Sequence, residues 1–182
     1  MTPFVRTTPK RLVVHLGNMG SHRGEKTRKY AKRFPNIKFI GIDLTPLVRL
    51  PGEAKKPRNW KQQQGDFFTR LRRQKPDSVD VISSELAVGY YGRPEQNMES
   101  DRSRPAPTTQ LLKTIHEKLK PGGKCFLVVD SIIRDRLLEM LANTPFRPEK
   151  ISFYRIPTQH MDRTNWMRSN QFPVLFQLTL EK

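Results

Sequence analysis

The sequence predicts an α/β fold in which a mostly parallel sheet is covered by helices on both faces. Short apolar runs rich in β-branched residues alternate with segments of helical periodicity, which is typical of parallel strands joined by crossover helices. The chain has 182 residues and no internal repeat, which is the length of one ordinary domain. We therefore expect a single domain over residues 1–182.

Strands are predicted where apolar residues cluster, at residues 12–16, 38–44, 78–84, 124–129, 151–156 and 174–180. A further strand is expected before Gly65, where the sequence signal is poor. One helix is predicted to end before Pro35, because a proline stops a helix, and another begins at Phe67. Two more helices are predicted at residues 109–119 and 132–141, and the Pro-Gly-Gly of residues 121–123 closes the first of these with a left-handed turn.

Three segments interrupt this pattern. Residues 1–11 form a basic N-terminal arm, and residues 45–61 carry three prolines that favour an irregular connection or a short broken helix. Residues 89–107 combine glycines, prolines and charged residues. They are predicted to form a long surface loop, which is either a lid or binding loop or a disordered connection.

The charge balance is strongly basic. Lys and Arg total 34 against 17 for Asp and Glu, which gives a net charge of +17 and a pI near 10.5. A field of this size attracts polyanions, so we expect nucleic acid, and RNA in particular, as a partner. The alternative is that the charge only maintains solubility. No apolar stretch reaches the ~20 residues of a membrane span, so no membrane partner is predicted.

The cysteine and histidine content narrows the chemistry. Cys125 is the only cysteine, so an internal disulfide is excluded and a reducing compartment is expected. The cytoplasm is the first choice, and a mitochondrial-type matrix the second, because the first acidic residue is Glu25, behind several basic ones. No metal site is predicted, since His15, His22, His116 and His160 lack the spacing of metal ligands.

Glycine or acidic residues follow four consecutive predicted strands. A glycine-containing turn runs from Gly17 to Gly24, Asp43 closes the second strand, Asp66 follows Gly65, and Glu85 follows the next strand. Ligands of open α/β sheets bind beside the carboxyl ends of the strands. These residues therefore predict a site for a nucleotide-like ligand, although each acid alone is also explained as a helix cap or a solvated charge.

The order of motifs resembles class I S-adenosylmethionine-dependent methyltransferases. The matching segments are VVHLGNMGSHRG, FIGIDL, QGDFF, DSVDVISSEL and LLKTIHEKLKPGGKCFLVVD. Within this class, the segments KYAKRFPNIKFIGIDL, VVDSIIRDRLLEML and RTNWMRSNQFPVLFQLTLEK look most similar to tRNA (guanine-N7) methyltransferases. The resemblance implies a Rossmann-like doubly wound sheet, mostly parallel with an antiparallel C-terminal strand.

The resemblance also implies S-adenosylmethionine as cofactor and assigns roles to residues. Asp43 would bind the cofactor ribose and Asp66 would lie near its adenine. The full set of expected cofactor-binding residues is Gly17, Asn18, Met19, Gly20, Asp43, Leu44, Asp66, Phe67 and Glu85. The residues expected to handle the target base are Glu85, Tyr90 and Asp130.

RNA is expected to contact basic and aromatic side chains outside the cofactor site. Phosphate contacts are assigned to arginines on the helix that begins at Phe67, and base contacts to tyrosines of the 89–107 loop. The expected RNA-binding residues are Arg70, Arg72, Arg73, Tyr90, Tyr91 and Arg93. Trp60, Trp166 and the two tyrosines either stack on unpaired bases or cover the ends of the core.

Three functional hypotheses follow. The first is an S-adenosylmethionine-dependent methyltransferase acting on tRNA or rRNA. The second is a non-catalytic methyltransferase-like protein that binds RNA or assists ribonucleoprotein assembly. It is motivated by the net charge of +17 together with an altered glycine turn, in which Met19 and Ser21 stand at glycine places; His15 also stands where an acid is usual. The third is a small-molecule methyltransferase whose charge reflects its host.

Overall fold

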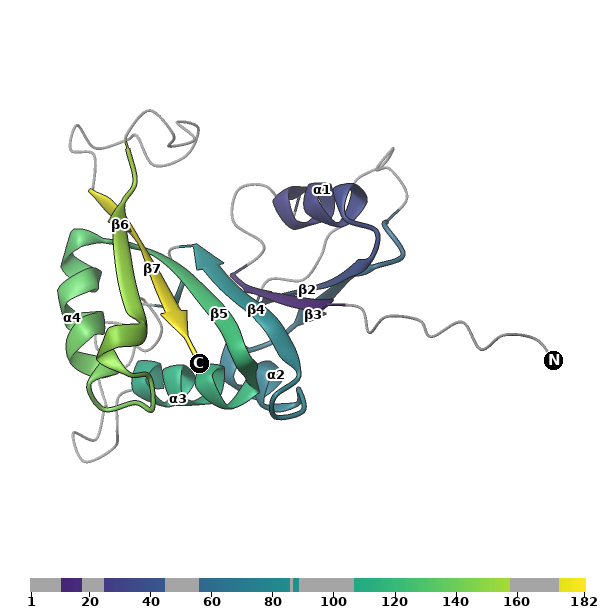
Figure 1. The fold of residues 1–182 in the computed structure, drawn as a ribbon. Helices are drawn as coiled ribbons and strands as arrows, with labels where there is room; N and C mark the ends of the chain where they lie inside the picture. The colour runs from purple at the N-terminus through teal and green to yellow at the C-terminus, as the bar shows by residue number, and fades with distance from the viewer. Residues whose placement is uncertain (1–10, 18–24, 45–55, 86, 89–106, 158–173) are drawn as a thin grey trace.

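The structure is a computed structural model that describes residues 11–17, 25–44, 56–85, 87–88, 107–157 and 174–182 (Figure 1). Its strands form one seven-stranded sheet in the order β3-β2-β1-β4-β5-β7-β6. The strands are β1 (Arg11–Leu16), β2 (Ile37–Asp43), β3 (Trp60–Gln64), β4 (Val79–Glu85), β5 (Leu119–Asp130), β6 (Ile151–Arg155) and β7 (Leu175–Glu181).

The sheet is parallel from β3 through β5 and antiparallel where β7 pairs with β5 and with β6. The predicted fold class is therefore confirmed, including the antiparallel C-terminal strand. All five parallel strands end at the same edge of the sheet, which brings the residues that follow β1, β2, β3 and β4 next to one another.

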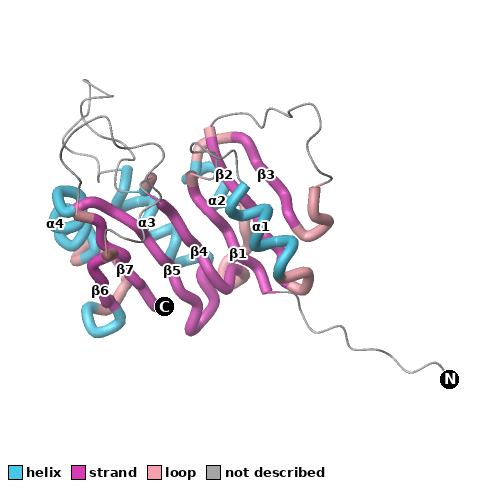
Figure 2. Tube along the Cα trace, turned by 90° about the horizontal axis from the view of Figure 1, so that it is seen from above, coloured by secondary structure: helices cyan, strands magenta, loops and turns pink. Residues whose placement is uncertain are grey.

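Helices pack on both faces of this sheet (Figures 1 and 2). On one face, α1 (Glu25–Arg33) lies against β2 and β3. On the other face lie α2 (Phe67–Arg72), α3 (Pro107–Lys118) and α4 (Ser131–Leu141), and α3 contacts both of its neighbours. A short 3-10 helix, η3 (Pro148–Lys150), precedes β6.

The strands alternate between these two faces, as the period of two requires. Ile82, Cys125 and Leu127 point toward α3 and α4 and form the main core with fully buried residues such as Leu112 and Leu137. Cys125 is a buried free cysteine within this core. On the opposite face a smaller cluster consists of Ala31, Phe39 and Trp60.

The structure corrects several predicted boundaries. Trp60 and Lys61 belong to β3, not to an irregular connection, because Trp60 fills the small core under α1. The strand β5 begins at Leu119 rather than at residue 124, and it includes the Pro-Gly-Gly segment, in which Gly122 does take a positive φ of 73°. Residue 107 opens α3 instead of closing the preceding loop, and Glu85 is the last residue of β4.

Candidate cofactor site at the carboxyl edge of the sheet

At the carboxyl edge of the sheet, backbone hydrogen bonds connect the turns that follow β1 and β3 to the end of β2. The amide of Gly17, just after β1, donates to the carbonyl oxygen of Ile42 at 2.9 Å, and the amide of Gly65, just after β3, donates to that of Asp43 at 2.8 Å. The turns after β1 and β3 are therefore both held against the end of β2. A ligand bound over these turns would meet groups that follow three neighbouring strands.

Gly17 occupies a position that no other residue fits. Its φ is 78°, in the left-handed region, and a Cβ placed on it would lie 2.6 Å from the Cβ of Ala87. The Phe67 ring lies at ordinary contact distance, 3.7 Å from the same point. The missing side chain is thus required by the packing of Ala87, a residue 70 positions away, and Gly17 can reach a ligand only through its backbone.

Asp43 and Leu44 lie at the end of β2 as predicted. Asp43 is half-buried and Leu44 is 64% exposed, which is unusual for a large apolar side chain. The Gln64 side-chain amide donates to the Leu44 carbonyl at 3.3 Å and ties the end of β3 to the chain beyond β2. A half-buried carboxylate beside an exposed apolar side chain suits the ribose hydroxyls and the base of a nucleoside.

Asp66 serves as the N-cap of α2. Its Oδ1 accepts a hydrogen bond from the Thr69 amide at 2.8 Å, which is the ordinary role of an aspartate before a helix. The alternative explanation of these acids as helix caps therefore holds for Asp66. Its neighbour Phe67 packs partly on the main core and lies beside Gly17, so the cap also brings Phe67 to the carboxyl edge.

Glu85 and Asp130 lie at the ends of β4 and β5. Glu85 is exposed at the last position of its strand. The Oδ1 atom of Asp130 accepts from the Ile133 amide at 2.8 Å and caps α4. Both predicted base-handling acids are therefore at the expected edge, and Asp130 has a structural role there as well.

His15, which stands where an acid is usual, is bound within the sheet. Its Nδ1 lies 2.8 Å from the Ser83 hydroxyl on β4, and the two residues are register partners. Ser84, the next residue, points to the other face, where its hydroxyl accepts from the Val88 amide at 3.3 Å. The His15–Ser83 pair joins positions 68 residues apart, and no sequence pattern indicated it.

The three arginines predicted to contact RNA lie in different surroundings. The Arg70 Nε donates to the Gln64 carbonyl at 2.7 Å, so this side chain folds back toward the end of β3. Arg72 lies at the end of α2 with its guanidinium 5.2 Å from the centre of the Phe68 ring, and Arg73 follows the helix as its C-cap. Both are exposed.

Several predicted residues lie outside the described part of the chain. They are Asn18, Met19 and Gly20 of the glycine turn, Tyr90, Tyr91 and Arg93 of the predicted loop, Trp166, and residues 1–10 of the basic arm. Among the described residues, no group of three or more His, Cys, Asp and Glu side chains is placed to hold a metal ion. No helix in the same part of the chain is long and apolar enough to cross a membrane.

Comparison with known proteins gives one curated relative and many similar folds. No family model matches the chain. The sequence is 27% identical over 155 residues to trans-aconitate 2-methyltransferase of Deinococcus radiodurans, a match that covers 84% of this chain and 52% of that protein. The chain thus spans about half the length of this relative.

Solved methyltransferases share the architecture. An S-adenosylmethionine-dependent methyltransferase of Archaeoglobus fulgidus superposes with a TM-score of 0.61 at 16% identity, covering 94% of this chain and 86% of that one. A 30S ribosomal A1408 methyltransferase from an uncultured bacterium gives a TM-score of 0.52 at 16% identity, covering 95% and 88%. The finer resemblance to tRNA (guanine-N7) methyltransferases stays a prediction. With its sheet order and antiparallel β7, the chain has the fold of the class I S-adenosylmethionine-dependent methyltransferases.

Proposed function

We propose that the chain is an S-adenosylmethionine-dependent methyltransferase whose acceptor is RNA. The main support for dependence on S-adenosylmethionine is the set of groups gathered at the carboxyl edge, because open α/β sheets bind ligands beside the carboxyl ends of their strands. Asp43 would accept hydrogen bonds from the ribose hydroxyls, and Leu44 and Phe67 would offer apolar contact to the adenine. The residues present therefore fit this cofactor.

The bound cofactor would supply an electrophilic methyl group on a sulfonium. Transfer of that group needs mainly alignment with the acceptor atom. Glu85, exposed at the end of β4, would orient the acceptor or take a proton from it. Asp130, whose Oδ1 caps α4, would act by fixing the adjoining backbone.

Titration calorimetry with S-adenosylmethionine tests this half of the proposal. Wild-type protein is expected to bind, and Asp43→Ala should lose about 1.5–3 kcal/mol per charged hydrogen bond to the ribose. Asp135→Ala is the matched control, since Asp135 lies exposed on α4 and pairs with Arg134 at 2.6 Å, and none of the predicted cofactor contacts involves it. No heat from the wild type at millimolar cofactor would leave the non-catalytic hypothesis in its place.

The RNA acceptor is supported by the net charge of +17 and by the use of this fold in a 30S ribosomal A1408 methyltransferase. A small-molecule acceptor is the second candidate, because the curated relative is a trans-aconitate methyltransferase. Salt separates the two: affinity for an RNA fragment should fall steeply with added salt. Absence of RNA affinity at low salt, together with intact cofactor binding, would favour the small-molecule acceptor.

A further inference from the structure

We infer that a basic and aromatic surface on α1 and the start of β3 binds single-stranded RNA at the amino edge of the sheet, opposite the candidate cofactor site. This surface, called the α1–β3 surface below, consists of residues at the end of α1, directly after it and directly before β3: Tyr30, Lys32, Arg33, Phe34, Lys56 and Arg58. The idea that this RNA flanks the methylated nucleotide rests on the proposed function. The binding of RNA to this surface does not depend on that function.

The charge of these segments is one-sided. The sequence has no Asp or Glu between residues 26 and 42 or between residues 54 and 65, and the structure packs these two segments together through α1, β2 and β3. Elsewhere in the described chain, basic side chains such as Lys120, Lys124 and Lys150 pair with acids. A local excess of cations is the electrostatic footprint expected for a polyanion.

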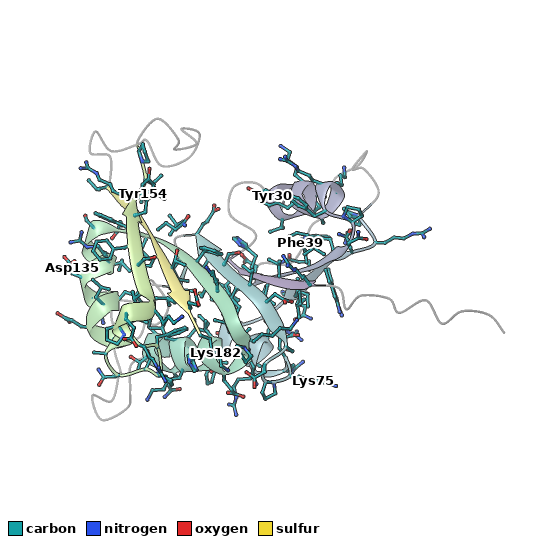
Figure 3. All side chains as sticks on the ribbon, viewed as in Figure 1. Tyr30, Phe39, Lys75, Asp135, Tyr154 and Lys182 are labelled. Carbon is teal, nitrogen blue, oxygen red and sulfur yellow. The ribbon has the colours of Figure 1, made fainter. Side chains whose placement is uncertain are left out.

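Aromatic rings lie among these cations. Tyr30, in the last turn of α1, is 44% exposed, and Phe34, the residue after the helix, is 42% exposed. The Phe34 amide donates to the Tyr30 carbonyl at 2.9 Å. The Arg33 guanidinium lies 5.6 Å from the centre of the Phe34 ring. Figure 3 shows Tyr30 on α1 and Phe39 on the strand beneath it. Exposed rings beside cations can stack on unpaired bases while the cations meet phosphates.

The surface is rigid because side chains lock the start of β3 to the end of α1. The Asn59 amide nitrogen lies 2.8, 3.0 and 2.7 Å from the carbonyl oxygens of Ala31, Phe34 and Ile37. The buried Trp60 Nε1 donates to the Thr27 hydroxyl at 3.2 Å. Trp60 thus covers the core, and the Lys56 ammonium lies 5.6 Å from its ring centre.

The same packing favours RNA over a membrane surface. A helix that binds a bilayer turns its apolar face outward, whereas α1 places Ala31 against Phe39 and Trp60. Its outward face keeps Lys32 and Arg33, both exposed. The amino edge is also remote from Asp43 and Glu85, which lie at the opposite ends of their strands. If the same RNA carries the methylated nucleotide, as the proposed function holds, it would contact the protein on both edges of the sheet.

Fluorescence anisotropy with a labelled single-stranded RNA, measured over a range of salt concentrations, tests the inference. The variant Lys32→Gln/Arg33→Gln/Lys56→Gln should weaken binding and reduce the salt slope by about 2, at roughly 0.7 for each phosphate that the protein no longer neutralises. Its matched control, Lys113→Gln/Arg136→Gln/Arg147→Gln, removes equal charge from exposed positions elsewhere. Equal losses of affinity in the two variants would overturn the inference, since they would show a uniform basic coat.

A second pair of variants tests the rings. Tyr30→Ser/Phe34→Ser should weaken RNA binding about tenfold or more per stacked base with the salt slope nearly unchanged. Phe153→Ser/Tyr154→Ser is the control, because these two rings are 58% and 61% exposed on β6. Wild-type affinity in the first double variant, or binding of the protein to anionic lipid vesicles in preference to RNA, would refute the assignment.

Cofactor titration of the same variants separates this inference from the proposed function. The two variants of the α1–β3 surface should bind S-adenosylmethionine like the wild type, because their residues lie at the amino edge of the sheet. If RNA binding follows the pattern above while the cofactor never binds, the surface stands and the enzymatic proposal fails. If the cofactor binds and substitutions in the α1–β3 surface leave RNA affinity unchanged, the enzymatic proposal stands and the inference about this surface fails.

Discussion

Substitution of Gly17 by alanine should destabilise the protein through two separate costs. The left-handed backbone costs a residue with a Cβ about 1–2 kcal/mol. The new Cβ would also lie 2.6 Å from that of Ala87, and overpacking of this kind costs about 1–3 kcal/mol. We therefore expect Gly17→Ala to lower the free energy of unfolding by roughly 2–5 kcal/mol.

Gly122 provides a control with nearly the same backbone conformation. Its φ is 73° against 78° for Gly17, and a Cβ there would meet nothing within 4 Å. Gly122→Ala should therefore show the backbone cost alone, about 1–2 kcal/mol. Alanine restricts the unfolded chain equally at both positions, so this effect cancels when the two variants are compared.

Urea denaturation measures both variants, with the slope of the transition as a check that unfolding remains two-state. The double variant Gly17→Ala/Ala87→Gly should recover the steric part and leave the backbone part, which a double-mutant cycle reports as a coupling energy. Equal costs at Gly17 and Gly122, or no coupling to Ala87, would refute this account of the turn.

Three further predictions concern titratable groups of the fold. Burial raises the pKa of Asp80, but its hydrogen bond with Lys120 at 2.8 Å helps to hold this pKa below the usual 3.8. Asp80→Asn should therefore lower the free energy of unfolding by about 1–2 kcal/mol near neutral pH. Urea denaturation at several pH values should show this difference vanish as the pH falls through the lowered pKa. Burial and the nearby Lys182 lower the pKa of His116 from 6.5, so stability measured by thermal unfolding should decline as the pH falls below about 6.5, and His116→Gln should flatten that decline. Burial raises the pKa of the Cys125 thiol, so a thiol reagent should label Cys125 only at the rate of unfolding; rapid labelling of native protein would contradict its burial.

The pattern of hydrophobic residues predicted most of the sheet, because the side chains on one or both faces of the central strands are buried. β3 gave a poor signal because it is an edge strand whose residues after Trp60 are lysine and glutamine. Its existence depends on Trp60 reaching under α1, which is a tertiary contact. The early start of β5 was missed for a related reason: Gly122 and Gly123 read as a turn, but Val79 pairs with Leu119 across a register shift.

The carboxyl edge could be predicted because strand polarity alone brings Asp43 and Glu85 together. What each group does there could not be predicted. Asp66 and Asp130 cap helices, and a sequence cannot separate a capping acid from a ligand-binding one at the same strand end. The contact of Gly17 with Ala87 and the pairing of His15 with Ser83 join distant positions, so no local pattern contains them.

The position of β7 imposes an order on folding. β7 follows β6 in the chain but lies between β5 and β6 in the sheet. Within the described residues, β6 pairs with β7 and with no other strand, so residues 151–155 join the rest of the sheet only through β7. Non-local pairing of this kind is slow. The two C-terminal strands should therefore dock late and together onto a five-stranded parallel intermediate, and hydrogen exchange during refolding should protect β1 and β4 before β6.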